Sequence, residues 1–487
     1  MSPEYKAVVA INVDTLYTSA TIDLAVQPQI LTLPQYDYSY SILQVDVFGN
    51  VLSTGLTNNS TGGTYALVGP NYKGSLPDGV KRIEVPENWS QLAIRTSLYT
   101  LNVDGTSYID TQSNAAAFRA STRLQSLSAW TASPTSGGET QILPISGNFS
   151  VPTKTIVDAL AQTKPREFLE LLQTGMESPS TTPLSASDRI LISEFRDRFA
   201  AAKSAAAVGS ITSLSDICAG ARAAHDAIVA NWHFNTVGNN WVHFNNMGEW
   251  GDAYLDRASG DLYIQYCNNR KAAYYAQAFL DNHSEMLTGV GNRTYTITFA
   301  ADQIPDCERF WSITAYTSDA IELVPNAANK YAVASYTPGL VTTNGSITIT
   351  LKTIGSNETT VAPNVLPIPE GRFSVMLRVY GPGGTALAGT YVPPAVVYED
   401  GKTPIKPIPS YSKETPSDWF GGLKSTETPQ SQVSSVIPAS VSANELKPKK
   451  NGVKGKSFAA KKAKGGSKKS STKKTTALSK KSSTKKA

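Results

Sequence analysis

RFSVMLRVY, residues 372–380, indicates the fold class of this chain, because apolar and polar side chains alternate along it. The same alternation occurs in TYTITF (294–299), FWSITAY (310–316) and SITITL (346–351). A period of two is that of a β-strand that packs one face on a core and turns the other to water. These strands predict a C-terminal β-sandwich domain over residues 291–398 whose sheets have one solvated face.

The first 150 residues carry a second group of strand patterns. Short β-branched and aromatic stretches at 39–51, 64–68, 80–85 and 92–98 are separated by turns rich in Gly, Pro and Asn. Short strands with this spacing are typical of sandwiches and barrels. The pattern predicts an antiparallel N-terminal β domain over residues 1–150.

Between these two regions the apolar period changes from two to nearly four. Leu191, Phe195 and Phe199 recur every four residues, and the apolar side chains of 217–228 have amphipathic helical spacing. The period predicts a helical and mixed segment over residues 151–290.

The end of the chain has the composition of a disordered polycation. Residues 399–446 are rich in Pro, Ser and Thr, and residues 447–487 contain sixteen Lys and no acid. The remaining residues, 1–446, hold 28 basic and 39 acidic side chains, a net charge of −11. Segments with so few aliphatic side chains cannot bury enough apolar surface to offset the entropy of ordering. We therefore predict a linker and then a disordered tail.

Together these regions predict a mainly β fold with two antiparallel β-sandwich or jelly-roll-like domains, a helical insert and a disordered basic C-terminal tail. No apolar run reaches the roughly 18 residues that span a bilayer, and Asp14 interrupts the N-terminus before a signal-peptide core could form. Three cysteines without CxxC spacing favour a reducing compartment. We expect an intracellular protein, with the nucleus or a virion as the compartments that the tail suggests.

The lysine-rich tail is the strongest functional signal in the sequence. Lysine is a flexible point charge suited to phosphate, and lysines without aromatic or Arg neighbours neutralise a polyanion without reading bases. We therefore predict that the tail binds nucleic acid or another polyanion. A localisation signal, an acidic-membrane contact and a solubilising tail are the alternatives. The predicted contacts are the paired lysines Lys461, Lys462, Lys468, Lys469, Lys473, Lys474, Lys480, Lys481, Lys485 and Lys486.

Five blocks carry a resemblance to a known family. INVDTLYTSATIDL (11–24), TYALVGPNYKG (64–74), FWSITAY (310–316), NVLPIP (364–369) and RVYGPGGTALAGTYVPP (378–394) occur together in this order. The chain resembles proteins with the paired Domain of Unknown Function 1254 (N-terminal) and Domain of Unknown Function 1214 (C-terminal) architecture. This resemblance implies a multidomain, mostly β protein with a helical insert, and it implies no particular chemistry.

The polar residues of the first block are the candidates that the resemblance supplies. The family's Asn-x-Asp-Thr-Leu-Tyr pattern matches this chain at Asn12, Asp14 and Tyr17, which we expect to bind a ligand. Its Asp-x-Tyr-Thr-Asn pattern appears as DVFGN, residues 46–50, which lacks the phenol and the hydroxyl.

No catalytic residue is assigned from the sequence. Asp14, Asp46 and Arg95 are the candidates, because a carboxylate near a guanidinium could act as a base with a tuned pKa. With Asn12 they could instead bind a polar ligand, and a structural ion pair is the alternative. No nucleotide-binding motif occurs, and no cofactor is predicted.

Two histidines lie in near-repeats, His233 in WHFN and His243 in VHFN, around a predicted hairpin. A hairpin could bring their imidazoles together as candidate metal ligands, but a catalytic metal needs about three protein ligands. Buried histidines of an aromatic cluster are the alternative. Asp281, His283 and Ser284 resemble a nucleophilic triad in composition, without the G-x-S-x-G elbow.

Three functions follow from these patterns. The first is a non-enzymatic binding or structural protein with a polyanion-binding tail, associated with packaging or a virion and with protein assembly partners. The second is an enzyme acting on a small molecule in a cleft between the β domains. The third is a carbohydrate- or surface-binding β-sandwich. The oligomeric state is not predicted.

Overall fold

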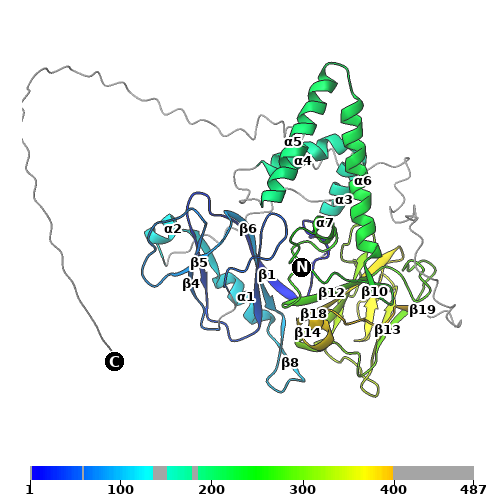
Figure 1. The fold of residues 1–487 in the computed structure, drawn as a ribbon. Coiled ribbons are helices and arrows are strands. Elements are labelled where there is room, and N and C mark those ends of the chain that lie inside the picture. The colour runs from blue at the N-terminus through cyan, green and yellow to red at the C-terminus, as the bar shows by residue number, and fades with distance from the viewer. Residues whose placement is uncertain (1–2, 57–59, 135–150, 178–184, 399–487) are drawn as a thin grey trace, which may run out of the picture. The chain divides into compact units, whose positions relative to one another are not determined.

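The computed structural model describes residues 3–56, 60–134, 151–177 and 185–398 (Figure 1). Its described part is mostly β, with several antiparallel sheets and with helices between them. The mainly β class predicted from the sequence is therefore confirmed. The predicted linker and the lysine-rich tail lie outside the described residues.

Two sheets form the N-terminal sandwich, in the strand orders β1-β6-β3 and β5-β4-β2-β9. Apolar side chains of both sheets and Phe118 form one core between them. The predicted strands at 64–68 and 92–98 occur as β4 and β6. The elements of this region are β1 (Thr15–Asp23), β2 (Gln29–Leu33), β3 (Tyr40–Val45), β4 (Gly63–Val68), β5 (Lys81–Glu84), β6 (Trp89–Ser97), β7 (Tyr99–Leu101), β8 (Tyr108–Asp110), α1 (Gln112–Ser121), β9 (Arg123–Ser126) and α2 (Leu127–Ala132).

Two further sheets form the C-terminal sandwich, in the orders β10-β11-β12-β18-β14-β15 and β17-β16-β13-β19. Most strand pairs are antiparallel, but β17 joins β16 in parallel, as β5 joins β4. The elements of this region are β10 (Thr236–Gly238), β11 (Trp241–Val242), β12 (Ala273–Ala278), β13 (Tyr295–Phe299), β14 (Cys307–Thr317), β15 (Ala332–Ala334), β16 (Ile347–Lys352), β17 (Val365–Pro367), β18 (Phe373–Pro382), α8 (Gly384–Ala388) and β19 (Val397–Tyr398).

The solvated face that alternation predicted occurs in only one of these two sheets. Along β13 and β16, inward residues are buried and their neighbours are partly or fully exposed. Along β14 and β18, nearly every residue is buried, so the prediction is wrong for 310–316 and 372–380. A second apolar cluster covers their outer face with side chains that include Trp232, Phe244 and Tyr263, together with residues 9–11.

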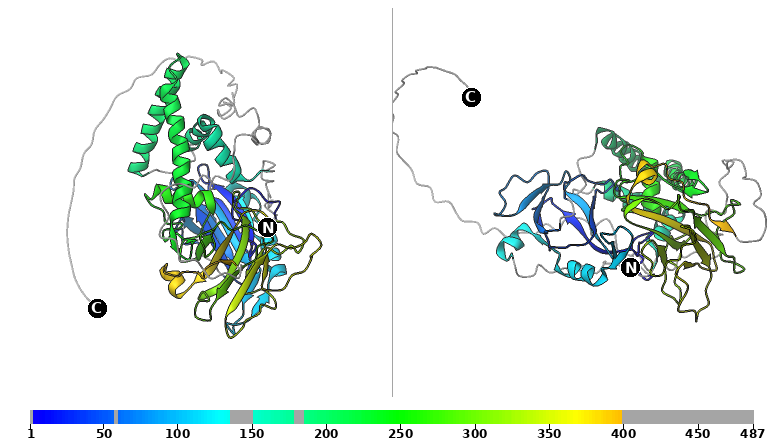
Figure 2. Two further views of the ribbon diagram at one scale, coloured as in Figure 1. Left: turned by 90° about the vertical axis from the view of Figure 1, so that its right-hand side faces the viewer. Right: turned by 90° about the horizontal axis from the view of Figure 1, so that it is seen from below.

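The helical segment supplies part of that cover. The segment predicted to be helical contains α3 (Thr153–Thr163), α4 (Pro165–Met176), α5 (Ala186–Ala207), α6 (Thr212–Phe234) and α7 (Tyr254–Tyr263). Helices α5 and α6 lie side by side and α6 also contacts α7, as Figures 1 and 2 show. Each predicted apolar stripe is only partly used, since Phe199 is fully buried whereas Leu191 is 48% exposed.

A hydrogen bond joins α3 to α6, because Asp158 of α3 accepts from His225 Nε2 of α6 at 2.8 Å. Within α3, the same carboxylate forms an ion pair with Lys154 Nζ at 2.7 Å. No helix of the described residues is long and apolar enough to cross a membrane.

The C-terminal core makes a direct prediction about stability. Ile349→Ala removes a fully buried side chain of β16, so it should lower the free energy of unfolding by about 2–5 kcal/mol. Val341→Ala, at a position that is 58% exposed, is the control and should change it by about 0.5 kcal/mol or less. Urea unfolding measures the free energy of unfolding of both variants. A loss for Ile349→Ala no larger than that for Val341→Ala would contradict the burial of Ile349 in this core.

Candidate ligand-binding site

A cavity of about 90 Å³ lies where the two sandwiches meet. Its wall comes from β1 and β6 of the N-terminal sandwich, from β12 and β18 of the C-terminal sandwich, and from the connecting segments 5–12 and 264–266. Asn12, Tyr17 and Arg95, three residues singled out in the sequence, line this cavity together.

Arg95 is the charged group at the centre of this site. It lies on β6 opposite Tyr17 of β1, and only 4% of its surface is exposed. Its Nη2 donates to the Tyr266 carbonyl at 2.8 Å, and its guanidinium lies 5.1 Å from the centre of the Tyr17 ring. Its Nε and Nη1 form no hydrogen bond of good geometry among the described residues, although the Tyr17 hydroxyl lies close to the guanidinium. Buried guanidinium donors without acceptors are costly, so this arrangement calls for an explanation.

The groups that surround Arg95 are phenols and not carboxylates. Tyr17, Tyr275 and Tyr380 are the tyrosines near its charge, and each lines the cavity. Burial raises the pKa of Tyr275, and it raises the pKa of Tyr380 well above the usual value. The phenols of Tyr275 and Tyr380 are therefore neutral at pH 7 and supply no counter-charge to Arg95.

A second guanidinium at the cavity, that of Arg378, is fully provided with partners. The register of β18 places it beside Tyr275 of β12 and Ser312 of β14. Its Nη1 donates to Tyr316 Oη at 2.7 Å and its Nη2 to the Ala10 carbonyl at 2.5 Å. Arg378 thus fixes the cavity wall and has few donors to spare.

Asp14 belongs to the Arg378 network and does not line the cavity. Its carboxylate accepts from Tyr336 Oη at 2.5 Å and from Ser312 Oγ at 2.8 Å. Burial raises the pKa of Asp14, while these two hydrogen bonds and the charge of Arg378 act in the opposite direction. The structure therefore separates Asp14 from Arg95, with which the sequence analysis had grouped it.

Asn12 connects the start of β1 to the cavity. Its Oδ1 accepts from the backbone N–H groups of Asp14 at 3.1 Å and Thr15 at 3.2 Å. Its Nδ2 donates to the Tyr380 hydroxyl. An Asx turn of this kind holds the chain where β1 begins, so the side chain both shapes and lines the site.

Asp46 lies outside the cavity and caps its own turn. Its Oδ1 accepts from the N–H groups of Phe48 and Asn50, both at 2.8 Å. Gly49 of this turn has φ +76°, and a Cβ there would lie 2.6 Å from Oδ1 of Asp261. Because the Asp261 side chain of α7 lies so close to this turn, a residue with a Cβ would clash with it, and only glycine fits at position 49. Asp46 and Asp261 thus lie close together, and burial with the charge of Asp46 raises the pKa of Asp261 to about 7 against the opposing charge of Arg257.

The segment that follows α7 is strained where it holds Arg95. Gln265 and Tyr266 have φ values of +54° and +46°, and both residues line the cavity. Consecutive residues other than glycine in the left-handed region are unusual and often mark functional sites. The strain sets the Tyr266 carbonyl against the Arg95 guanidinium.

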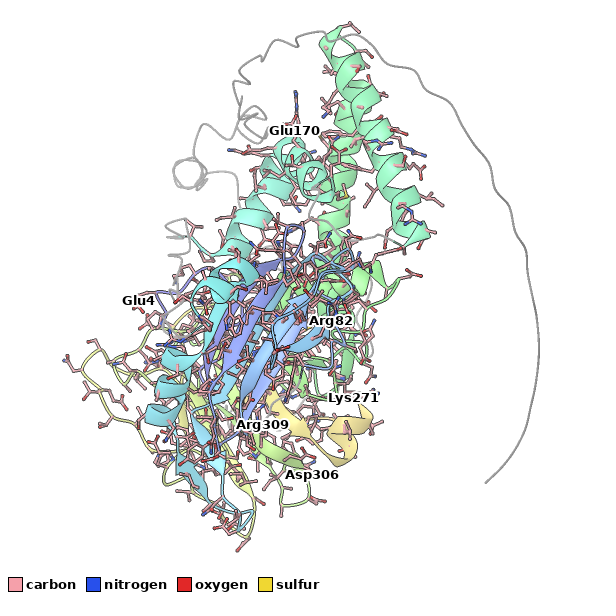
Figure 3. All side chains as sticks on the ribbon, turned by 90° about the vertical axis from the view of Figure 1, so that its left-hand side faces the viewer. Glu4, Arg82, Glu170, Lys271, Asp306 and Arg309 are labelled. Carbon is pink, nitrogen blue, oxygen red and sulfur yellow. The ribbon has the colours of Figure 1, made fainter. Side chains whose placement is uncertain are left out.

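Sequence reasoning missed Arg378, Tyr266 and Tyr380, although one signal was available. Arg378 shares its face of RFSVMLRVY with Met376 and Tyr380, and a charge among such large side chains needs partners once that face is covered. Arg309 of β14, labelled in Figure 3, is also near the site, and burial together with the charge of Arg95 lowers its pKa to about 10.

The two candidate metal ligands make different contacts. His233 Nε2 lies 3.0 Å from Tyr263 Oη, and burial followed by the charge of Lys154 lowers the pKa of His233 to about 3. His243 Nδ1 lies 2.8 Å from the Tyr275 carbonyl. Across the described ranges, no group of three His, Cys, Asp or Glu side chains could hold a metal ion.

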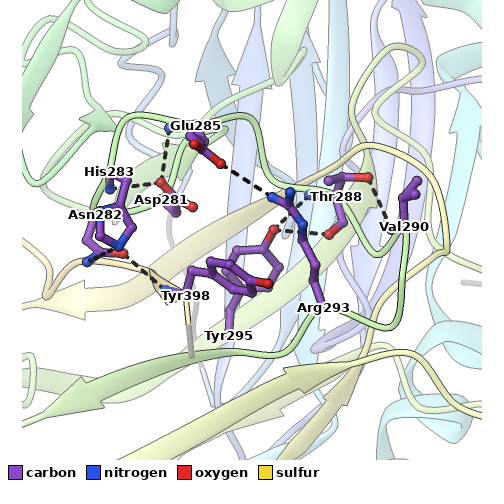
Figure 4. A network of polar contacts seen from close by, with 9 residues as sticks. All are labelled: Asp281, Asn282, His283, Glu285, Thr288, Val290, Arg293, Tyr295 and Tyr398. Carbon is purple, nitrogen blue, oxygen red and sulfur yellow. Dashed lines mark hydrogen bonds and ion pairs between the residues drawn. The ribbon is translucent and has the colours of Figure 1, made fainter. Parts of the chain in front are cut away.

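The residues that resemble a triad form a capped turn (Figure 4). Asp281 Oδ1 accepts from the backbone N–H groups of His283 at 2.8 Å and Glu285 at 3.0 Å. The carboxylate thus contacts the backbone of His283 and not its imidazole, which lies 3.3 Å from Asn282 Nδ2. This geometry is that of an Asx turn and not of a nucleophile with its base.

The unpaired charge of Arg95 predicts an unusual response to mutation. Arg95→Met keeps the apolar stem and removes the buried charge, so the free energy of unfolding should stay equal or rise by about 1 kcal/mol. Arg198→Met on exposed α5 is the control and should change it by about 0.5 kcal/mol or less. Urea unfolding measures both, and a loss above about 2 kcal/mol for Arg95→Met would show that Arg95 is a structural residue.

Asp261 predicts a pH dependence of stability. Its folded-state pKa of about 7 exceeds the ordinary value of 3.8, so the folded chain holds a proton that the unfolded chain has lost between those pH values. Its stabilising contribution is present below about pH 4 and is lost as the pH rises through 7. The wild type loses this contribution as the pH rises from 4 to 8, whereas Asp261→Asn does not. The free energy of unfolding of Asp261→Asn should therefore rise relative to that of the wild type by about 1–3 kcal/mol over this range.

Urea unfolding at a series of pH values measures this difference. Asp302→Asn, at an exposed aspartate, is the control and should follow the wild-type pH dependence. Parallel curves for the wild type and Asp261→Asn would contradict the burial of this carboxyl.

Comparisons with known proteins agree with the motifs. The family described as Protein of unknown function (DUF1254) matches residues 1–126, and Protein of unknown function (DUF1214) matches residues 272–384. No curated protein matches the chain.

Two solved structures are similar to it. The VPA0106 protein from Vibrio parahaemolyticus is 18% identical, with 80% of this chain and 90% of that chain covered and a TM-score of 0.49. A putative uncharacterized protein from Burkholderia cenocepacia is 12% identical, with 82% and 79% covered and a TM-score of 0.38. The chain thus carries a DUF1254 match at its N-terminus and a DUF1214 match at its C-terminus, which is the paired architecture that its motifs indicated.

Proposed function

We propose that this protein is a non-enzymatic binding protein whose body holds a small organic molecule in the cavity between the two sandwiches. The observation that carries the proposal is the convergence of Asn12, Tyr17 and Arg95 on one cavity, where donors of the buried Arg95 guanidinium lack acceptors. Ligand sites combine an apolar wall with a few polar groups that fix orientation. Apolar residues such as Val8, Val9 and Ala93 supply that wall here.

The residue types in the cavity favour binding over catalysis. Among the described residues that line it there is no carboxylate, histidine, lysine or cysteine. A general base needs a pKa near the working pH, and burial shifts the pKa of the phenols of Tyr275 and Tyr380 upward, away from neutrality. An enzyme acting on a small molecule in this cavity is therefore the less supported alternative.

The carbohydrate-binding alternative has less support from the arrangement of the aromatic side chains. Trp232, Trp241 and Trp311 are almost completely buried in the cores. Stacking on a sugar requires exposed aromatic faces, which these indoles do not offer.

Filling the cavity tests the proposed function. In Ala93→Leu, the larger side chain on β6 should occupy the ligand space. It should abolish binding of small organic molecules of about six non-hydrogen atoms or fewer, both anionic and neutral. Ala200→Leu makes the same change on the exposed surface of α5 and should keep wild-type binding. Ligand-observed NMR on the full chain measures this, and equal binding by wild type and Ala93→Leu would contradict the proposal.

A second observation, made on the sequence, supports a separate function for the tail. Residues 447–487 contain sixteen Lys and no acid, whereas residues 1–446 have a net charge of −11 and repel polyanions. We propose that the tail binds nucleic acid without base specificity, and that the protein acts where polyanions are concentrated, as in a nucleus or a virion.

A titration of duplex DNA in a series of salt concentrations tests the tail. The full chain should bind at low salt, and the logarithm of its affinity should fall linearly with the logarithm of salt concentration. The truncation to residues 1–446 should lose this binding without a change in melting temperature, because we predict that the tail is outside the folded cores. Equal binding by both chains, or preference for one base sequence, would contradict the proposal.

A further inference from the structure

We infer that the cavity binds a small monocarboxylate, whose carboxylate supplies the counter-charge and the acceptors that Arg95 lacks. This inference rests on the ligand-binding function proposed above and names the chemical class of the ligand. It depends on the charges, the spare donors and the size of the cavity.

The charges around the cavity do not balance. Three guanidiniums meet there, because Arg95 and Arg378 line the cavity and Arg309 is close enough to Arg95 for their charges to interact. Two buried carboxyl groups lie near this group of guanidiniums. Asp14 interacts with Arg378, whereas Asp261 of α7 acts on Tyr266 and Cys267. Within the described residues, no aspartate or glutamate forms an ion pair with Arg95. The site therefore carries excess positive charge that an anion would neutralise.

The spare donors point to Arg95 as the group that binds the anion. Arg378 already donates to Tyr316 and to the Ala10 carbonyl, whereas Nε and Nη1 of Arg95 find no acceptor in the described part of the chain. Guanidinium donors match the geometry of a carboxylate, and such charge-assisted hydrogen bonds are the strong ones. Nε of Arg309 also lacks an acceptor among the described residues, but Arg309 does not line the cavity. Arg95 is therefore the lining guanidinium that offers spare donors, and a single such group suits a monoanion better than a phosphate dianion.

The size and wall of the cavity define the rest of the ligand. A volume of about 90 Å³ is well below the roughly 150 Å³ of an apolar cavity that binds benzene, so it limits the ligand to about six non-hydrogen atoms or fewer. Val8, Val9 and Ile264 form an apolar part of the wall. An apolar body of a few carbon atoms attached to the carboxylate fits both observations. Propionate, with five non-hydrogen atoms, and butyrate, with six, are of this size.

Matched charged and neutral probes test the inference on the full chain. Propionate and butyrate are compared with propionamide and butyramide, which keep the shape and lose the charge, and with inorganic phosphate. Isothermal titration calorimetry should show that at least one carboxylate binds at least tenfold more tightly than its amide and than phosphate.

Substitution of Arg95 then locates the charge that is responsible. Arg95→Gln keeps a polar side chain without the charge, so it should weaken carboxylate binding at least tenfold and leave amide binding within twofold. Arg198→Gln, at the exposed site on α5, is the matched control and should leave all five affinities unchanged. If Arg95→Gln does not fold, the wild-type comparison of carboxylate with amide decides the question alone.

The outcomes separate the inference from the function on which it rests. If amide and carboxylate bind equally and Ala93→Leu abolishes the binding of both, the ligand class inferred here is wrong but the proposed ligand-binding function stands. Tighter binding of phosphate than of either carboxylate would also overturn the inference. Absence of binding by all five probes at millimolar concentration would overturn both.

Discussion

The burial of one guanidinium, that of Arg378, in the middle of a sheet is the constraint on which the rest of the structure depends. A charge enclosed between β12 and β14 can remain only if every neighbour satisfies it. The N-terminal segment supplies the partners that the sheet lacks, since Ala10 offers its carbonyl and Asp14 its negative charge. Tyr316 reinforces this by donating to the Ile11 carbonyl at 2.7 Å. The outer face of the sheet is therefore covered, and the two sandwiches meet over it.

The same constraint explains why a cavity with excess positive charge exists at that meeting. Asp14 is held by Tyr336 and Ser312 in the Arg378 network, so it is not available to Arg95. The strained Tyr266 carbonyl satisfies Nη2 of Arg95 and none of its other donors. Arg378 thus has hydrogen-bond partners and the nearby carboxylate of Asp14, whereas Arg95 keeps donors without acceptors. This difference in hydrogen bonding distinguishes Arg95 as the group in the cavity that is free to bind a ligand.

The sequence predicts the strands of this fold better than it predicts what covers them. Alternation depends on each strand alone, whereas burial of both faces of β18 depends on α6, α7 and the N-terminal segment. Asn12, Tyr17 and Arg95 could be singled out as polar residues beside or on strands, and they share a cavity. The separation of Asp14 from Arg95 could not be predicted, because it is set by a hydrogen bond from Tyr336, a residue 322 positions further along the chain.

Packing alone does not account for an arginine at position 95, because an uncharged side chain of similar size would pack there at a lower desolvation cost. Glutamine or methionine at this position of β6 would fill similar space without an unpaired charge, and many single substitutions of this kind stabilise proteins. Strain at Gln265 and Tyr266 adds a second cost at the same place. Two unfavourable features that meet at one cavity are difficult to explain by folding alone. A ligand that neutralises Arg95 would offset the first cost on binding, because it would bind the folded chain and not the unfolded one.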